Sequence, residues 1–384
     1  MTTPSAKPAL RSAAVSIDPR HRCSFADVPP GAPAQPATTS MLTAPGHPPT
    51  ARPQPDTRYG AAMTKRPKVT VLGSLNMDIS VDVPRLPGPG ATVLGSAARF
   101  TPGGKGANQA VAAARLGADV RMVGCVGDDG FGRQLLAALR VEGIDTEAVR
   151  VVASVPTGLA MIAVDQAAEN LVIVAPGANH QVGPPEIAAT GAHPRDLMVI
   201  SAEIPAPAVT QAVGQAGPII FNLAPAPENA PALVAAAGQD LDWLVVNESE
   251  AAAVLGHPIN GLSGAQRAAA ELITAGPRHA VVTAGAHGAA LASTAGTAGT
   301  AGPVGPDGTQ VIEGFRVRAV DTVGAGDTFV GALAVALAAG IPAPEATRAA
   351  VAAGAAAVTR PGAQAAMPRP ADILAATGVT WPLA

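Results

Sequence analysis

Short hydrophobic runs alternate with longer alanine- and leucine-rich runs along most of this chain, from Val69 onward. The short runs are rich in β-branched residues, which is typical of buried strands, and the longer runs place apolar residues at helical spacing. This alternation predicts a mainly parallel sheet covered by helices on both faces. The expected strands are 69–73, 120–126, 197–201, 219–222, 244–247 and 280–283, and the expected helices are 107–116, 131–142, 250–255 and 265–275.

Polar residues or glycine stand at or just past the ends of several expected strands, at Asn76, Asn222, Asn247 and Gly285. In sheets of this class, ligands bind beyond the carboxyl ends of the strands, so these positions predict a binding edge. Two other stretches, 91–100 and 158–174, have the pattern of antiparallel ribbons. The Ala-Gly-Thr triplets within 294–308 predict a low-complexity loop at a hairpin tip.

Residues 1–63 differ in kind, because they are dense in Pro, Ala, Thr and Arg without helical or strand periodicity. We expect this segment to be disordered. Two readings of it stay open: a transit peptide, or an extension upstream of a true start at Met63. The remainder, 64–384, is long enough to bury a sizeable core as one large domain with a subdomain.

Composition indicates a cytoplasmic enzyme without nucleic-acid or membrane partners. The net charge of −3 provides no basic surface for nucleic acid and no membrane attraction. The apolar stretches, such as 331–339, are shorter than the roughly 20 residues that span a bilayer. Cys23 and Cys125 are the only cysteines, which is typical of a reducing compartment.

The run from Val320 to Leu333 places a lone carboxylate after a glycine turn, at the head of an apolar helix. Gly324 and Gly326 allow close approach of a ligand, and the unpaired N–H groups of the first helical turn favour an anion. A carboxylate at Asp327 suits a general base that removes a proton from an alcohol beside a bound phosphate. The alternative is an Asp that merely caps the helix.

A second glycine-rich run, 101–109, also leads into a helix. Its glycines expose backbone donors, while Lys105 adds a cation and Asn108 a two-sided hydrogen-bonding group, so it suits a polyhydroxylated or phosphorylated ligand. It is neither a Walker loop nor a dinucleotide fingerprint, since Gln109 stands where the third glycine of the fingerprint would be. A plain glycine turn remains the alternative.

These two runs, in this order and about 220 residues apart, resemble the paired signatures of the ribokinase-like (PfkB) carbohydrate kinases. The resemblance covers residues 67–377. It implies a three-layer α/β/α sandwich with a mainly parallel central sheet and a small β-sheet lid, built from segments near 76–101 and 158–175. The segments that resemble family blocks are 103–132, 222–226, 247–250, 283–288, 320–333 and 358–364.

The sugar site that the resemblance implies begins with Asn76 and Asp78, two residues apart in an extended segment. Their side chains then share one face, with Met77 pointing away; a simple turn after the first strand is the alternative. Glu203, at the mouth of an apolar strand, is either a sugar contact or an ordinary solvated residue. The substrate-binding residues implied by resemblance are Asn76, Met77, Asp78, Gly104, Lys105, Gly106, Ala107, Asn108, Glu203 and Asp327.

For the nucleotide, the resemblance implies that Asn247 contacts ATP and that Glu250 arranges Mg²⁺, through water. Mg²⁺ keeps several waters, so one outer carboxylate suffices. A capping box explains the same two residues locally. The implied ATP contacts are Asn247, Thr283, Ala284, Gly285, Ala286, His287, Gly288, Gly326 and Asp327, and the implied anion hole is Gly324, Ala325 and Gly326.

A monovalent cation, K⁺, is also implied by resemblance. It would be held mostly by backbone oxygens, beside the glycine turn. Ala366 departs from the family pattern, in which serine is common, so one ligand is in doubt. The matching positions are Asp321, Val323, Ala357, Arg360, Gly362 and Ala366.

The resemblance implies ATP-dependent phosphorylation of D-ribose at O5, with Asp327 as the base, in a homodimer that contacts through the lid. Other substrates remain open: deoxyribose, fructose-type sugars or a nucleoside. The nucleoside is disfavoured by an aromatic content of 2%. A non-catalytic sugar-binding regulator is a different class of function, against which the intact Asp327 argues. A dehydrogenase is remote, because neither glycine run completes the fingerprint.

Overall fold

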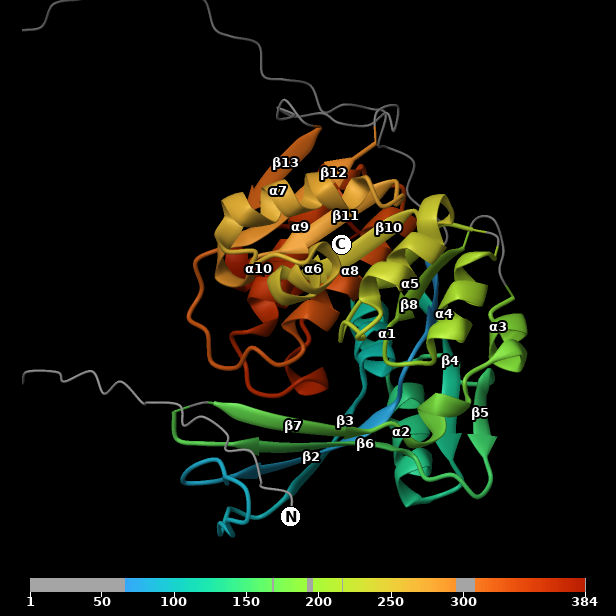
Figure 1. Ribbon diagram of the computed structural model, residues 1–384, viewed down its shortest axis with the longest axis vertical. Helices are drawn as coiled ribbons and strands as arrows, with labels where there is room; N and C mark the ends of the chain where they lie inside the picture. The colour runs from blue at the N-terminus through green and yellow to red at the C-terminus, as the bar shows by residue number, and fades with distance from the viewer. Residues whose placement is uncertain (1–65, 168, 192–195, 216, 295–307, 384) are drawn as a thin grey trace, which may run out of the picture. The chain divides into compact units, whose positions relative to one another are not determined.

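The computed structural model describes residues 66–383, apart from 168, 192–195, 216 and 295–307. A nine-stranded sheet forms its centre (Figure 1). The seven strands from β11 to β5 run parallel, and β12 and β13 complete one edge in antiparallel pairing. The strand order is β13 (Thr309–Glu313), β12 (Gly288–Ser293), β11 (His279–Thr283), β10 (Trp243–Asn247), β9 (Ile219–Asn222), β8 (Leu197–Ser201), β1 (Lys68–Leu72), β4 (Asp119–Gly127) and β5 (Val149–Val152).

Helices cover both faces of this sheet, so the expected three-layer α/β/α sandwich is confirmed. One face carries α1 (Lys105–Arg115), α2 (Gly130–Val141), α8 (Ala325–Ala338), α9 (Ala343–Ala357) and α10 (Pro370–Thr377). The other face carries α3 (Pro184–Ala189), α4 (Ala206–Val213), α5 (Ala230–Ala237), α6 (Glu248–Leu255) and α7 (Gly261–Ile273).

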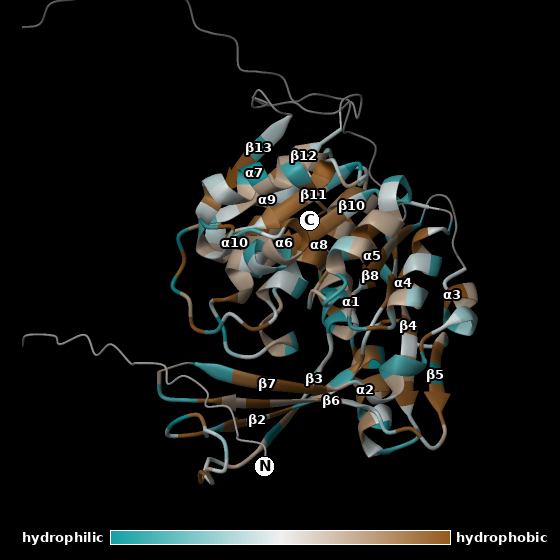
Figure 2. Cartoon of the chain, in the orientation of Figure 1, coloured by the Kyte–Doolittle hydropathy of each residue, from teal (hydrophilic) through white to brown (hydrophobic). Residues whose placement is uncertain are grey.

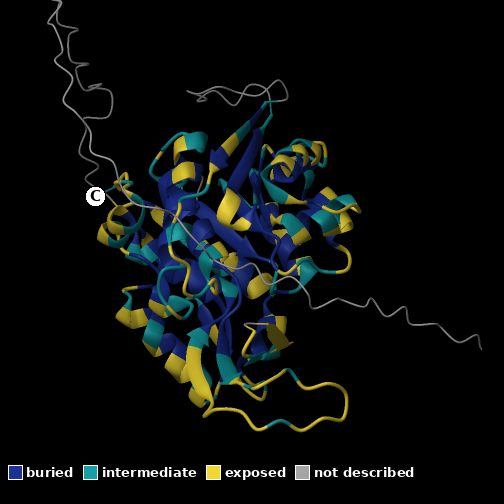
Figure 3. Cartoon of the chain, turned by 90° about the vertical axis from the view of Figure 1, so that its left-hand side faces the viewer, coloured by how far each residue is buried: buried dark blue, intermediate teal, exposed yellow. Residues whose placement is uncertain are grey.

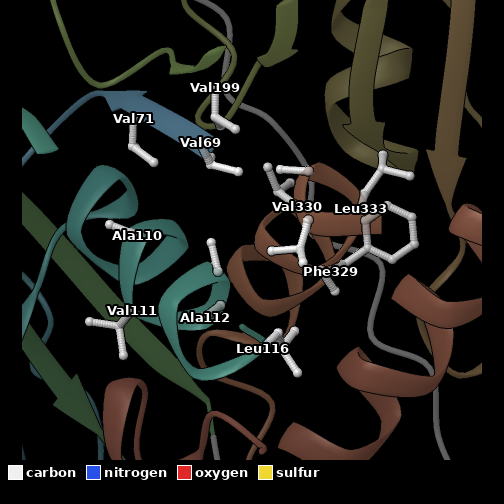
Figure 4. Packing of buried hydrophobic residues seen from close by; sticks show 14 of the residues in the cluster. Val69, Val71, Ala110, Val111, Ala112, Leu116, Val199, Phe329, Val330 and Leu333 are labelled. Atoms are coloured by element: carbon white, nitrogen blue, oxygen red, sulfur yellow. The ribbon is translucent and has the colours of Figure 1, made fainter. Parts of the chain in front are cut away.

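The central strands are hydrophobic without interruption because both of their faces are buried. In β8, Leu197 and Val199 pack toward α1 and α8, whereas Met198 and Ile200 pack toward α3–α7. Figure 2 shows the resulting apolar interior along β10 and β11. Figure 4 shows the first of the two cores, where Val199 of the sheet faces apolar residues of α1 and α8.

A second sheet of four strands forms the expected lid, in the order β3 (Arg99–Gly103), β2 (Asn76–Asp82), β6 (Gly158–Val164) and β7 (Asn170–Ala175). The prediction of a ribbon at 158–174 is confirmed, since β6 and β7 pair antiparallel. The prediction of a ribbon over 91–100 is wrong for 91–98, which contain no strand; pairing with β2 begins only at Arg99. Figure 3 shows the exposed loop before β3.

The other boundaries differ from expectation by a few residues. Strands 197–201 and 219–222 are confirmed at both ends. Helices α1 and α6 each begin two residues earlier than predicted, at Lys105 and Glu248. The predicted disordered segment 1–63 lies outside the described residues, as does most of the predicted loop 294–308. Within the part of the chain that is described, no helix is both long and apolar enough to cross a membrane.

Helix α8 packs directly on α1, and a glycine sets their separation. A Cβ atom on Gly331 would lie 2.7 Å from both the Cβ of Ala112 and the backbone oxygen of Gln109. Any larger residue would therefore force the helices apart. Asp327 lies one turn before Gly331 on the same face of α8, so this close contact brings it against α1.

Candidate active site

The carboxylate of Asp327 lies at the head of α8 and is held by α1. Asn108 Nδ2 donates to its Oδ2 at 2.9 Å, and Gln109 Nε2 donates to its Oδ1 at 3.2 Å. Asp327 is only 8% exposed. The helix is capped by Gly324, so the alternative of a capping Asp is wrong. One lone pair on each carboxylate oxygen remains available to a ligand.

The N-terminus of α8 presents unpaired backbone donors beside this carboxylate. Gly324 adopts a left-handed conformation with φ of 76°, which glycine permits at little cost. The first intrahelical bond runs from Thr328 N–H to the oxygen of Gly324 at 2.8 Å. The N–H groups of Gly326 and Asp327 precede it and suit an anion. The N–H of Ala325 is less available, since it donates to the oxygen of Thr322 at 3.3 Å.

A cavity of about 240 Å³ opens at the carboxyl ends of β9–β11 and contains this turn. It brings together predicted residues from distant parts of the sequence. Lining residues among those predicted are Lys105, Asn247, Glu250, Thr283, Gly324, Gly326 and Asp327. A larger cavity of about 410 Å³, at the opposite edge of the sheet, contains none of them.

Lys105 is the cation around which the acidic residues gather. Burial lowers its pKa, but the carboxylates of Asp327, Glu203, Glu250 and Asp78 outweigh this effect, so the pKa is raised overall. Lys105 therefore carries its charge at neutral pH. A buried cation among the predicted base and the predicted sugar residues suits a phosphate group with its multiple negative charges.

On the sugar side of Lys105, Glu203 accepts several hydrogen bonds. Ser74 Oγ donates to its Oε2 at 2.5 Å, Asn76 Nδ2 donates to the same oxygen at 3.4 Å, and the backbone N–H of Lys105 donates to it at 3.3 Å. Glu203 is thus tied to two predicted segments, which argues against the alternative of a solvated strand-end residue.

The first residues of β2 are extended, as expected, rather than a turn. Asn76 is buried, and its Oδ1 accepts from Asn179 Nδ2 at 2.7 Å. Met77 is 1% exposed and its side chain packs in the hydrophobic core, and its assignment as a substrate contact stays a prediction. Burial, with the charges of Glu203 and Asp327, raises the pKa of Asp78 to about 7, although Lys105 opposes this.

At the start of α6, the structure contains the capping box. Asn247 Oδ1 accepts from the backbone N–H of Glu250 at 2.9 Å, and Glu250 Oε2 accepts from that of Asn247 at 2.8 Å. Burial raises the pKa of Glu250. Both residues also line the cavity, so the local cap places them where a nucleotide site is expected.

The predicted nucleotide turn follows β11. Thr283 lines the cavity, and the next residues form a 3₁₀ turn, Gly285–His287, before β12 begins at Gly288. His287 is exposed. Ala284 is buried, whereas Gly285 and Ala286 are exposed.

The segments predicted to hold a monovalent cation lie together around Asp321. Its Oδ1 accepts from the N–H of Val323 at 3.0 Å and its Oδ2 from that of Gly362 at 2.8 Å. The oxygen of Ala357 accepts from the N–H of Arg360 at 3.3 Å. Ala366 is 1% exposed and has no side-chain oxygen to offer.

Three buried residues contribute to the site that the sequence did not assign to it. Gln109 lies behind Asp327 and beside Asn222, which the sequence placed at the binding edge, and Ser74 and Asn179 lie behind Glu203 and Asn76. The signal available for Gln109 is its place in the glycine-rich run. The contacts of Ser74 and Asn179 reach more than 100 residues away in sequence, which no local pattern indicates.

Known proteins share this architecture. The chain is 35% identical over 309 residues to a ribokinase of Haemophilus influenzae, a match covering 79% of this chain and 96% of the relative. The crystal structure of ribokinase from Thermotoga maritima matches with a TM-score of 0.68 and 32% identity, covering 80% of this chain and 98% of that one. An Arabidopsis thaliana ribokinase complexed with ribose and ATP matches with a TM-score of 0.67 and 29% identity, covering 81% and 98% of the two chains.

The sequence model of the pfkB family of carbohydrate kinases matches residues 66–370, which include both glycine-rich runs and the lid. The resemblance expected from the sequence is confirmed. This chain belongs to the pfkB carbohydrate kinase family.

Proposed function

We propose that this protein transfers the γ-phosphoryl group of ATP to O5 of D-ribose, giving ribose 5-phosphate and ADP. The observation that carries the proposal is the buried carboxylate of Asp327, placed beside free helix N–H groups and within the field of Lys105. The relatives named above support the substrates, because they are ribokinases and one is complexed with ribose and ATP.

In the proposed reaction, O5 attacks the γ-phosphorus in line with the leaving ADP. The O5–P bond forms as the bond from the γ-phosphorus to the bridging oxygen breaks, and that electron pair remains on ADP. The proton of the O5 hydroxyl passes to the carboxylate of Asp327. The N–H groups of Gly326 and Asp327 stabilise the charge that develops on the phosphoryl oxygens.

Mg²⁺ and K⁺ complete the proposal. MgATP is the expected form of the donor, with Glu250 near the metal through water, because Mg²⁺ keeps several waters and binds few protein ligands. For K⁺, the N–H groups of Val323 and Gly362 both donate to the Asp321 carboxylate, so these predicted segments lie together, while Ala366 offers no side-chain ligand. We therefore expect weak K⁺ activation.

ADP formation with ATP and Mg²⁺ tests the function, on ribose, 2-deoxyribose, fructose and adenosine, each with and without K⁺. We expect ribose to be the best substrate and K⁺ to raise its rate only modestly. A higher kcat/KM on another sugar would reassign the substrate, and no turnover on any of them would favour the sugar-binding regulator.

We also propose that the protein is a homodimer that pairs through the lid. The lid exposes an apolar surface, with Phe100, Met161, Ile173 and other residues of β7 between 39% and 54% exposed. An edge strand with such side chains favours pairing with a second copy. Small-angle scattering at micromolar concentration should give the mass of a dimer, and Ile173→Lys should shift it to a monomer; a wild-type monomer would contradict the proposal.

A further inference from the structure

We propose that Gln109 is a positioning residue that, together with Asn222, holds the carboxylate of Asp327 in the orientation needed for proton removal. The inference rests on the proposed role of Asp327 as the base. Gln109 is 0% exposed. Its side chain therefore acts through Asp327 rather than on the sugar directly.

The direction of each hydrogen bond behind Asp327 is fixed by the backbone of β10. Asn222 Nδ2 donates to the oxygen of Val245 at 3.2 Å, and only the amide nitrogen of Asn222 can do so. Its Oδ1 therefore faces Gln109, whose Nε2 donates to it at 2.9 Å. The same nitrogen donates its second hydrogen to Asp327 Oδ1 at 3.2 Å. Turning the Gln109 carboxamide over would bring oxygen against oxygen at both contacts.

This arrangement leaves one polar atom of Gln109 unsatisfied. Its Oε1 is buried without a hydrogen-bond partner among the described residues. A buried acceptor without a partner destabilises the fold, and a methionine side chain, of similar length, would avoid this cost. Packing of α1 alone does not explain a carboxamide here, whereas a need to place two N–H donors against Asn222 and Asp327 does.

Two donors on different oxygens fix the plane of the Asp327 carboxylate. Asn108 Nδ2 binds Oδ2, and Asn108 is itself oriented because its Oδ1 accepts from Gln364 Nε2 at 3.1 Å. Gln109 binds Oδ1. Removing Gln109 leaves one donor, so the carboxylate can rotate about its Cβ–Cγ bond away from the attacking hydroxyl. Such misplacement lowers the chemical step more than it lowers binding.

The test is Gln109→Met, which removes the donors at similar volume. We expect kcat to fall about 10-fold or more, with the KM for the sugar changed by less than about threefold. Gln266→Met is the matched control, since Gln266 lies in α7 and makes one side-chain bond, to Thr309 Oγ1 at 2.9 Å, away from the site. It should retain normal kcat.

The double variant Gln109→Met with Asp327→Ala distinguishes a positioning role of Gln109 from a general loss of folded structure. If Gln109 acts through Asp327, Gln109→Met lowers the residual turnover of Asp327→Ala by less than about twofold. An equal fall in both backgrounds, or a normal kcat in the single variant, would overturn the inference. Crystal structures of the wild type and Gln109→Met give a readout without turnover. A rotated Asp327 carboxylate supports the inference and an unmoved one refutes it, even if the wild type phosphorylates none of the sugars and the proposed function fails.

Discussion

Replacing Asp327 with alanine should lower kcat for ribose about 100-fold or more, because general base catalysis contributes on that order. The two hydrogen bonds to Asn108 and Gln109 hold the carboxylate in place without using all of its lone pairs. Steady-state ADP release gives kcat, and calorimetric titration gives the affinities for ribose and ATP. Both affinities should stay close to normal, since the loss is confined to the chemical step.

Asp119→Ala is the matched control for this variant. Asp119 is an exposed aspartate at the amino end of β4, at the edge of the sheet opposite the cavity. Its loss should leave kcat unchanged. Near-normal turnover in Asp327→Ala, with a folded protein by circular dichroism, would remove Asp327 from the role of base.

Replacing Asp78 with asparagine should lower kcat/KM for ribose about 10- to 100-fold at pH 8, the range expected for losing hydrogen bonds to a charged acceptor. The wild type should itself lose kcat/KM as the pH falls below 7, because the pKa of Asp78 is raised to about 7 by burial and by Glu203 and Asp327. Below this pH the carboxyl group of Asp78 is protonated and accepts fewer hydrogen bonds from the hydroxyl groups of the sugar. Asp78→Asn should lack this dependence.

The same variant should be more stable than the wild type at high pH. The pKa of Asp78 rises from 3.8 in the unfolded chain to about 7, so the folded state binds more protons between these values and loses stability as the pH rises through them. Asp78→Asn should therefore raise the Tm by a few degrees at pH 8, with a smaller gain at pH 5.

Asp82→Asn provides the control on the same strand, since Asp82 is exposed and its pKa is lowered by a hydrogen bond from Arg99. It should leave both the Tm and the pH profile of kcat/KM nearly unchanged. If kcat/KM of Asp78→Asn still fell below pH 7 as in the wild type, a group other than Asp78 would cause the pH dependence.

The sheet was predictable because its strands are buried on both faces, which produces uninterrupted hydrophobic runs such as 197–201. The first strands of the lid were harder to predict from the sequence. Residues 91–98 contain β-branched and aliphatic side chains, but Leu94 is 87% exposed and the segment forms no strand. Strand β3 instead includes Pro102 and Gly103, two residues with low strand propensity, because pairing with Asn76 and Met77 outweighs local preference.

Many of the residues that line the cavity could be predicted from the glycine-rich runs and the family resemblance. The residues behind them could not. Gln109 meets Asp327 across 218 positions of sequence, and the contact exists only because Gly331 lets two helices pack closely. Periodicity and spacing describe neighbours along the chain, so a contact of this kind becomes visible only when the packing is known.

The division of the site between two sheets makes its two tasks separable. Asn76 and Asp78 belong to β2 of the four-stranded sheet, whereas Asp327 and the amides that orient it lie on α8 and α1, which pack on the nine-stranded sheet. If Asn76 and Asp78 bind the sugar as proposed, substitutions at these positions should change which hydroxyls are recognised without altering the contact between α1 and α8 that holds Asp327. Redesign for a new acceptor should therefore begin at the start of β2, with α1 and α8 left intact.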